Sequence, residues 1–260
     1  MKIIDLSIAV IMILLSAPPT ARAESPSADE IVAASDAVRN PDKPFSLTTT
    51  LIEYREGRQR DKMVLTVYSK VDPQNGQYRS LIRFIEPLRD ENKLMLKNGN
   101  ILWFFDPATK ASVRLSAQQR LMGQAANGDV ATVNFHKDYA ASLTARETIT
   151  DANKTLRECH KLAMRANNDT VIYYRIEYWV DVENNQPVKG KFYSESERLL
   201  KIVYYRGYQA QLGSMRPTEM IIIDGLDSKL VTQMSYSNYA YRDIPEEWYL
   251  KEFLPRFKGE

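Results

Sequence analysis

Cys159 and His160 are the two residues whose types come nearest to a catalytic pair, because an imidazole can take the proton of a thiol and make it a nucleophile. The residues around them alternate between apolar and charged, which predicts a β-strand. Adjacent side chains of a strand point to opposite faces, so this thiol and this imidazole cannot meet. No Gly-x-Ser-x-Gly segment supplies a serine nucleophile. We therefore expect no catalytic residue and no enzyme activity.

Metal, cofactor and nucleic-acid binding are also not favoured. His136 and His160 are the only histidines, whereas a zinc site needs several ligands at characteristic spacings. The acidic residues are scattered singly, and the chain has no glycine-rich phosphate loop. The formal net charge of +2 gives no reason to expect nucleic acid as a partner. We expect neither a metal nor a cofactor.

Residues 1–23 have the pattern of a secretory signal peptide. Lys2 precedes an apolar run at residues 8–15, and small residues before and at Ala23 form a cleavage site. Asp5, near the start of the apolar run, leaves an uncleaved membrane anchor as the alternative. No cysteine lies near the cleavage site, so the mature protein is not expected to be a lipoprotein. Its single cysteine allows no internal disulfide, and the fold must rest on burial.

The sequence predicts that β-strands make up most of the chain and position any binding side chains. The clearest alternation spans residues 172–180, where Ile176 and Tyr178 share one face and Arg175 and Glu177 the other. Turn signals at Asn98-Gly99 and Asp106-Pro107 predict three short strands in a meander between residues 94 and 115. Further strands are expected near residues 45–55, 63–71, 78–86, 156–165, 188–194, 199–208, 216–224 and 230–239.

Residues 116–144 interrupt this pattern with helix-forming residues. They contain Leu121, Met122 and Phe135, which need a hydrophobic environment. We expect an irregular insertion with one or two short helices that covers an open barrel end as a lid. Short helices are also expected from about residue 28 to 39 and after Pro245.

The predicted fold class is mainly β with a few helices, an α+β chain built on a strongly curved antiparallel sheet or unclosed β-barrel with a helical lid. Residues 24–260 are expected to form a single domain, since the sequence shows no flexible linker and no internal repeat.

A resemblance to a known family rests on residues 99–107, whose sequence is GNILWFFDP. This segment resembles the strand and turn of periplasmic lipoprotein carriers of the LolA type, and especially of the LolA-like outer-membrane lipoprotein-sorting proteins. Residues 120–123 and 134–138 are similar to the segment that follows in those relatives. The resemblance spans most of the mature chain. It implies a periplasmic carrier whose hydrophobic barrel binds lipid or the acyl chains of a lipoprotein.

The resemblance also implies partners and a gate. Relatives often accompany membrane transporters of the resistance-nodulation type, so an inner-membrane transporter and transient membrane contact are possible partners. LolA-type carriers keep a gating arginine that ties the lid to the barrel, and its position beside the lid makes Arg120 the candidate. One alternative function is a periplasmic sensor or interaction protein that uses the same fold to detect lipids or lipoproteins. An esterase is a third hypothesis.

The candidate binding residues are apolar and aromatic side chains on the predicted strands, which exceed what so few helices can cover. For each of them, plain core packing is the competing interpretation. The expected cavity residues are Ile82, Phe84, Trp103, Phe105, Leu162, Met164, Ile172, Tyr174, Ile176, Tyr178, Tyr204 and Met234. The expected lid residues are Arg120, Leu121, Met122 and Phe135.

Overall fold

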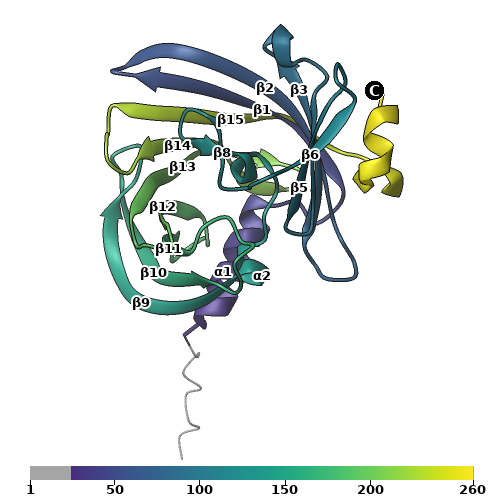
Figure 1. Cartoon of the computed structure of the whole chain (residues 1–260). Helices are drawn as coiled ribbons and strands as arrows, with labels where there is room; N and C mark the ends of the chain where they lie inside the picture. The colour runs from purple at the N-terminus through teal and green to yellow at the C-terminus, as the bar shows by residue number, and fades with distance from the viewer. Residues whose placement is uncertain (1–24, 260) are drawn as a thin grey trace, which may run out of the picture.

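The computed structural model describes residues 25–259, and one antiparallel sheet dominates it (Figure 1). Its 13 strands lie in the order β6-β5-β4-β3-β2-β1-β15-β14-β13-β12-β11-β10-β9. The central pair joins the two ends of the chain, because β1 pairs with β15. The strands are β1 (Phe45–Arg55), β2 (Arg58–Val71), β3 (Tyr78–Glu86), β4 (Leu94–Asn98), β5 (Ile101–Asp106), β6 (Ala111–Leu115), β9 (Tyr139–Thr150), β10 (Leu156–Ala166), β11 (Arg175–Asp181), β12 (Pro187–Tyr193), β13 (Leu199–Gln211), β14 (Ser214–Asp224) and β15 (Leu230–Tyr241).

The sheet is strongly curved and unclosed. β6 and β9 are its edges, and within the described residues they do not pair with each other. The period of two puts alternate side chains on the concave face: Ile176 lies opposite Met164, and Tyr178 lies opposite Leu162. The expected fold class, a mainly β chain with few helices and an unclosed barrel, is confirmed.

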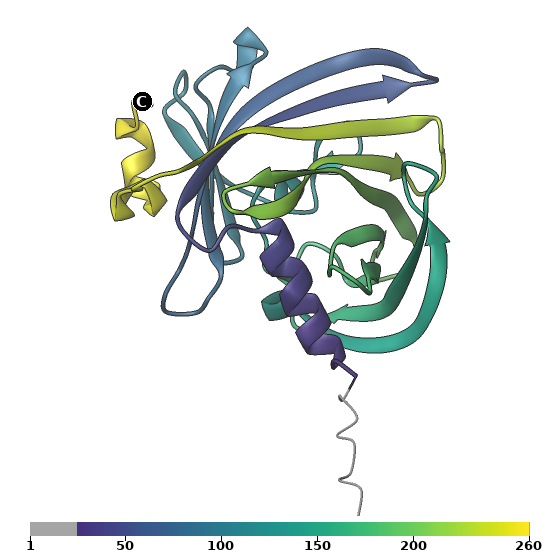
Figure 2. The ribbon, with the colours of Figure 1, turned by 180° about the vertical axis from the view of Figure 1, so that it is seen from behind.

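Helix α1 (Ala28–Arg39) lies across the hollow formed by the β9–β14 part of the sheet (Figure 2). The predicted capping box is present, since the Ser27 side chain accepts from the Glu30 backbone N–H while the Glu30 side chain accepts from that of Ser27. Ile31 and Val32 are buried on the side that faces the sheet. The helix therefore closes one side of the hollow.

Residues 116–138, here called the inserted segment, leave the large sheet and enter its hollow. They form the short hairpin β7 (Arg120–Met122) and β8 (Ala125–Ala126), then η2 (Asn127–Val130) and α2 (Phe135–Asp138). The expected irregular insertion with short helices is therefore present. Residues 120–126 form a hairpin within it, because Gly123 adopts a φ of +54° and turns the chain. The expected end of the insertion at residue 144 was wrong. Residues 139–144 belong to β9, where small side chains hide the strand alternation from the sequence pattern.

The C-terminal segment forms η3 (Glu246–Tyr249) and η4 (Lys251–Arg256) and packs on the convex face of the sheet (Figure 1). Ile244, Tyr249 and Leu254 contact the outward side chains of β2–β5 there. No helix in the described part of the chain is long and apolar enough to cross a membrane. The expected signal peptide lies outside the described residues.

Candidate functional site

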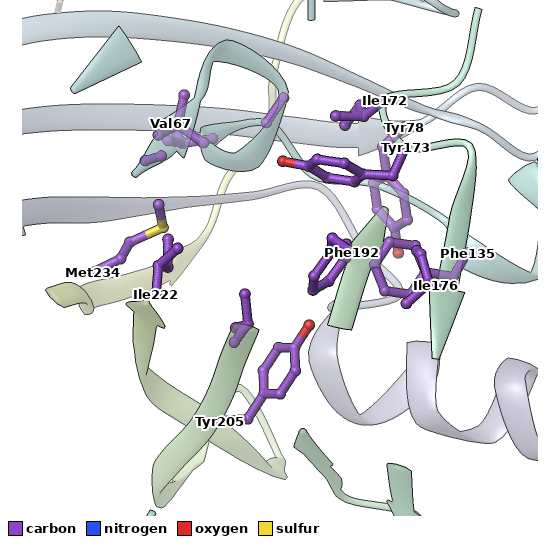
Figure 3. Close-up of a cluster of buried hydrophobic side chains, with 14 of the residues drawn as sticks. Val67, Tyr78, Phe135, Ile172, Tyr173, Ile176, Phe192, Tyr205, Ile222 and Met234 are labelled. Atoms are coloured by element: carbon purple, nitrogen blue, oxygen red, sulfur yellow. The ribbon is translucent and has the colours of Figure 1, made fainter. Parts of the chain in front are cut away.

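The concave face of the sheet carries one large apolar cluster (Figure 3). It draws on strands from both halves of the sheet, including Val67 of β2, Tyr205 of β13 and Met234 of β15. Most of the predicted cavity residues meet in it. They are Ile82, Phe84, Leu162, Met164, Ile172, Ile176, Tyr178 and Met234.

Trp103 and Phe105 do not belong to this cluster, and their predicted place in the cavity is wrong. Leu102 and Phe104 point to the concave face, so the alternating side chains of β5 place Trp103 and Phe105 on the convex face. There they contact the C-terminal segment, and the Lys251 ammonium lies 4.1 Å from the centre of the Trp103 ring. An uninterrupted apolar run contains no polar residue that would reveal which side faces the interior.

Tyr204 and Tyr174 also lie away from the interior. Val203 and Tyr205 point inward, which turns Tyr204 outward, where its ring lies 5.3 Å from the Lys189 ammonium. Tyr174 lies just before β11 and is partly exposed. Its hydroxyl accepts a hydrogen bond of 2.9 Å from the exposed Arg165 side chain.

The inserted segment fills much of the hollow. Met122 and Phe135 are buried in the apolar cluster and Leu121 packs against it, as expected of lid residues. The Phe135 ring stands edge-on to Tyr139 and Tyr178, with centroids 5.5 and 5.6 Å apart. These contacts place side chains of the inserted segment within the apolar cluster of the concave face.

A cavity of about 90 Å³ remains between the inserted segment and the sheet. Its walls are mixed, with apolar Phe45 and Met220 but also Arg39, Thr49 and Asp129. The Thr49 hydroxyl and the Arg39 Nε are buried without a hydrogen-bond partner among the described residues. Pockets for small organic ligands usually enclose about 300–1,000 Å³, so this cavity is smaller than a typical ligand pocket.

Polar contacts hold the inserted segment against β13–β15. Asp129 of η2 forms a buried ion pair with Lys201 of β13, and the Tyr173 hydroxyl donates to the other Asp129 oxygen at 2.7 Å. The Gln124 backbone N–H donates to the Thr232 hydroxyl of β15 at 2.7 Å. Burial lowers the pKa of Lys201, and Asp129 opposes that effect.

A second group of contacts holds the other end of the inserted segment. The Thr132 hydroxyl lies 2.7 Å from the Ser69 hydroxyl of β2, and the Asn40 side chain donates to the Val133 carbonyl at 2.8 Å. The His136 backbone N–H donates to Asp36 of α1 at 2.8 Å. Burial raises the pKa of that carboxyl, although Arg39 and His136 act against the shift.

Arg120 does not tie the inserted segment to the sheet. It is exposed, and its guanidinium donates at 3.3 Å to Gln124 of the same segment. Two other arginines, the partly buried Arg39 and the buried Arg216, contact α1 and its surroundings. Arg39 pairs with Asp36 and lies 4.0 Å from the Phe135 ring centre, and Arg216 of β14 donates to the carbonyls at the end of α1. Arg216 therefore holds the helix to the sheet, as a capping cation does.

Sequence reasoning missed the charged residues of these contacts. Asp129, Arg39 and Arg216 are isolated charges with no motif around them. Lys201 did leave a signal, because it interrupts the apolar run of residues 199–203 at an inward-facing position. A lysine there needs a buried counter-ion.

Cys159 and His160 lie as the strand pattern predicts. Cys159 is fully buried on the convex side against Trp179 and Val188, and burial raises the pKa of its thiol to about 12. A thiol with that pKa is not activated as a nucleophile. Burial lowers the pKa of the adjacent His160. Within residues 25–259, no group of His, Cys, Asp and Glu side chains could hold a metal ion.

The chain is similar to solved structures of known families. It shares 32% identity with a LolA superfamily protein from Nitrosomonas europaea, covering 88% of this chain and 100% of that one, at a TM-score of 0.79. A domain from Vibrio parahaemolyticus, described as an outer membrane lipoprotein-sorting protein domain, has a TM-score of 0.73 at 17% identity, over 88% of this chain and 98% of that one.

A third solved structure and a family model also match the chain. A DUF1329 family protein from Desulfovibrio piger has a TM-score of 0.73 at 18% identity, over 87% of this chain and 97% of that one. At that identity the likeness shows the fold alone. The family model that matches residues 76–256 is described as an uncharacterized protein. No curated protein matches the sequence.

Proposed function

Because this chain belongs to the LolA superfamily, we propose that it is a periplasmic carrier, without enzymatic activity, that binds lipids or the acyl chains of lipoproteins in the hollow of its sheet. The observation that carries the proposal is the inserted segment, whose apolar side chains occupy an interior lined by the concave face. The expected periplasmic location, transient membrane contact and service to an inner-membrane transporter are parts of the same proposal.

The binding mechanism is an exchange of one apolar occupant for another. Met122, Val130 and Phe135 fill the interior in the closed state, and an acyl chain takes their place when the inserted segment swings out. Each methylene group that leaves water contributes about 0.8 kcal/mol, which offsets the exposure of these side chains. The ligand stabilises the open state by its higher affinity for that state.

The polar contacts set the free energy of opening. Their partners on the sheet include Lys201 of β13, Thr232 of β15 and Ser69 of β2. Opening breaks these contacts without unpairing the large sheet, because β7 and β8 pair only with each other. The inserted segment can therefore move while the pairing of the 13-stranded sheet stays intact.

A reversible covalent lock tests this proposal. The Ser69 and Thr132 hydroxyl oxygens lie 2.7 Å apart, so the double variant Ser69→Cys/Thr132→Cys brings two sulfur atoms to disulfide distance. The native Cys159 is buried on the convex side and does not interfere. Lipid binding is then measured by native mass spectrometry of the mature protein, oxidised and reduced, with the two single variants as controls.

We expect the oxidised double variant to bind no lipid and the reduced form to bind as the wild type does. Equal lipid binding in the oxidised and reduced forms would overturn the proposed site beneath the inserted segment. A wild-type protein that takes up neither phospholipid nor triacylated lipoprotein would overturn the carrier function itself.

A further inference from the structure

A second pocket, of about 270 Å³, opens to solvent on the far side of the contacts that hold the inserted segment. Three cationic side chains line it: Arg120, Arg198 and Lys201. We call it the basic pocket. Its acidic lining residue, Asp224, already accepts hydrogen bonds from the backbone N–H groups of Leu226 and Asp227, at 2.9 and 3.0 Å. The pocket therefore presents an excess of positive charge.

The two arginines of the basic pocket lack counter-ions. Within the part of the chain that the structure describes, neither Arg120 nor Arg198 forms an ion pair, and both are exposed. Lys201 differs, because its side chain is only 5% exposed and its partner is Asp129. An anion in this pocket would find two guanidinium groups without a counter-ion, of which Arg120 donates to the neutral Gln124 side chain, and one ammonium group that is already paired.

The Lys201–Asp129 ion pair separates the basic pocket from the interior. Lys201 and Tyr173 line the basic pocket, whereas Asp129 lines the cavity of about 90 Å³ beneath the inserted segment. The Tyr173 hydroxyl donates a hydrogen bond to Asp129. Lys201 and Tyr173, which both line the basic pocket, therefore bind the same carboxylate. An anion that draws the Lys201 ammonium toward the basic pocket weakens its ion pair with Asp129, and this pair attaches η2 to β13.

A groove of about 800 Å³ continues from the basic pocket, and its lining mixes apolar side chains with polar ones that include Asp169 and Glu195. The two share Gln118, Arg198 and Leu200, and Val171 and Ile172 line the groove. A ligand with a charged head and an apolar chain could place its head between the arginines and its chain against Val171, Ile172 and Leu200. Ile172 is also part of the interior cluster, so the groove leads to the hollow.

We propose that the basic pocket binds the phosphate group of an anionic amphiphile such as a phospholipid, and that this phosphate competes with Asp129 for Lys201 and so releases the inserted segment. The inference rests on the proposed carrier function and adds its trigger and the chemistry of the ligand head. The interior then opens only when a phosphate-bearing ligand has docked at its entrance. An inorganic phosphate ion offers the same charge without the chain.

Hydrogen exchange of the inserted segment tests the trigger. The mature protein is incubated with short-chain phosphatidylglycerol below its micelle concentration, with the matched diacylglycerol that lacks phosphate, or with inorganic phosphate. Exchange is followed by mass spectrometry over residues 116–134, which include the bonded amides of Gln124 and Ala126. We expect phosphatidylglycerol to raise their exchange rate about tenfold and diacylglycerol to leave it unchanged.

Matched variants locate the effect. Arg120→Gln/Arg198→Gln removes two charges from the basic pocket and should abolish the response. Arg58→Gln/Arg114→Gln removes two charges from exposed arginines elsewhere on the sheet and should keep it. A response to phosphatidylglycerol alone assigns the ligand to lipid, and an equal response to inorganic phosphate assigns it to the free ion; either supports the phosphate site.

Two outcomes overturn the inference. One is equal opening by diacylglycerol and phosphatidylglycerol, and the other is a full response in Arg120→Gln/Arg198→Gln. If the carrier function itself fails, the result is distinguishable, because the wild type then binds no lipid in native mass spectrometry. A protein that binds lipid but shows no phosphate-dependent exchange retains the carrier function and loses only this trigger.

Discussion

Lys201 of β13 and Asp129 of η2 form an ion pair in which the two side chains are 5% and 11% exposed. The pair links the largest sheet to the inserted segment across 72 residues of sequence. Asp129→Asn leaves the Lys201 ammonium buried without a counter-ion, and breaking such a pair costs about 3–5 kcal/mol. We expect chemical denaturation to show a loss of this order, together with faster hydrogen exchange in residues 116–134.

The double variant Asp129→Asn/Lys201→Met provides the control for that prediction. Methionine has a similar volume and no charge, so the double variant should recover most of the lost stability. If Asp129→Asn alone keeps the wild-type free energy of unfolding, the ion pair does not stabilise the closed inserted segment.

Gly123 provides a second way to loosen the inserted segment. A Cβ atom at this position would lie 2.2 Å from the Thr232 hydroxyl, and the residue has a positive φ of +54°. Gly123→Ala should therefore displace the hairpin and break the Gln124–Thr232 hydrogen bond, at a cost of about 1–3 kcal/mol. Stopped-flow uptake of a fluorescent fatty acid should become faster, while circular dichroism remains unchanged.

Gly57→Ala is the matched control for that experiment. Gly57 also has a positive φ, but a Cβ atom there meets no neighbouring atom. The strain of the backbone is similar, and only the contact with the inserted segment differs. Equal uptake rates in the two variants would show that the Gly123 hairpin does not limit access to the interior.

Trp103 tests which face of the sheet binds lipid. The structure places this side chain on the convex face under Lys251, so Trp103→Ala should loosen η3 and η4 and leave lipid binding unchanged. Ile176→Ala on the concave face should lower lipid affinity and reduce the free energy of unfolding by about 2–5 kcal/mol. Loss of lipid binding in Trp103→Ala, with the concave face intact, would contradict this assignment.

The buried Cys159 predicts a pH dependence of stability. Burial raises the pKa of its thiol to about 12, above the value of about 8.5 for an exposed thiol in the unfolded chain. Above that lower value the unfolded chain loses the proton while the folded chain keeps it. This contribution to stability is therefore complete below the unfolded pKa and is lost as the pH rises toward about 12, at up to about 1.4 kcal/mol per pH unit.

The measurement compares the wild type with Cys159→Ala by urea denaturation between neutral and alkaline pH. The difference between the two proteins isolates the thiol from the tyrosines that titrate in the same range. We expect the stability advantage of the wild type to shrink as the pH rises. A difference that stays constant would show that the thiol ionises equally in the folded and unfolded states.

Much of the fold follows from the sequence because alternation is a local signal. Ile176 and Tyr178 alternate with charged neighbours, so both their strand and their face could be predicted. Trp103 and Phe105 lie in a run without polar residues, and only tertiary packing decides which face they take. Residues 139–144 were misassigned because small residues fit a strand or a helix equally well.

The contacts that close the interior could not be read from the sequence for a different reason. Lys201 and Asp129 are far apart in the chain, and their pairing depends on where η2 enters the hollow. A single buried charge has no periodicity, and its partner becomes visible only in three dimensions. The lid was predicted from its hydrophobic residues, while its attachment depends on charged and hydroxyl side chains.

The pairing of β1 with β15 has a consequence for how the chain folds. Leu51 lies opposite Met234, so the middle of the sheet forms only after the last strand has become available. Closing so long a loop is entropically unfavourable, and contacts of this kind slow folding. Until then, the first hairpins present an unpaired strand edge that can associate with other chains. We therefore expect a chain truncated before β15 to aggregate, and the intact chain to need protection from aggregation until its synthesis is complete.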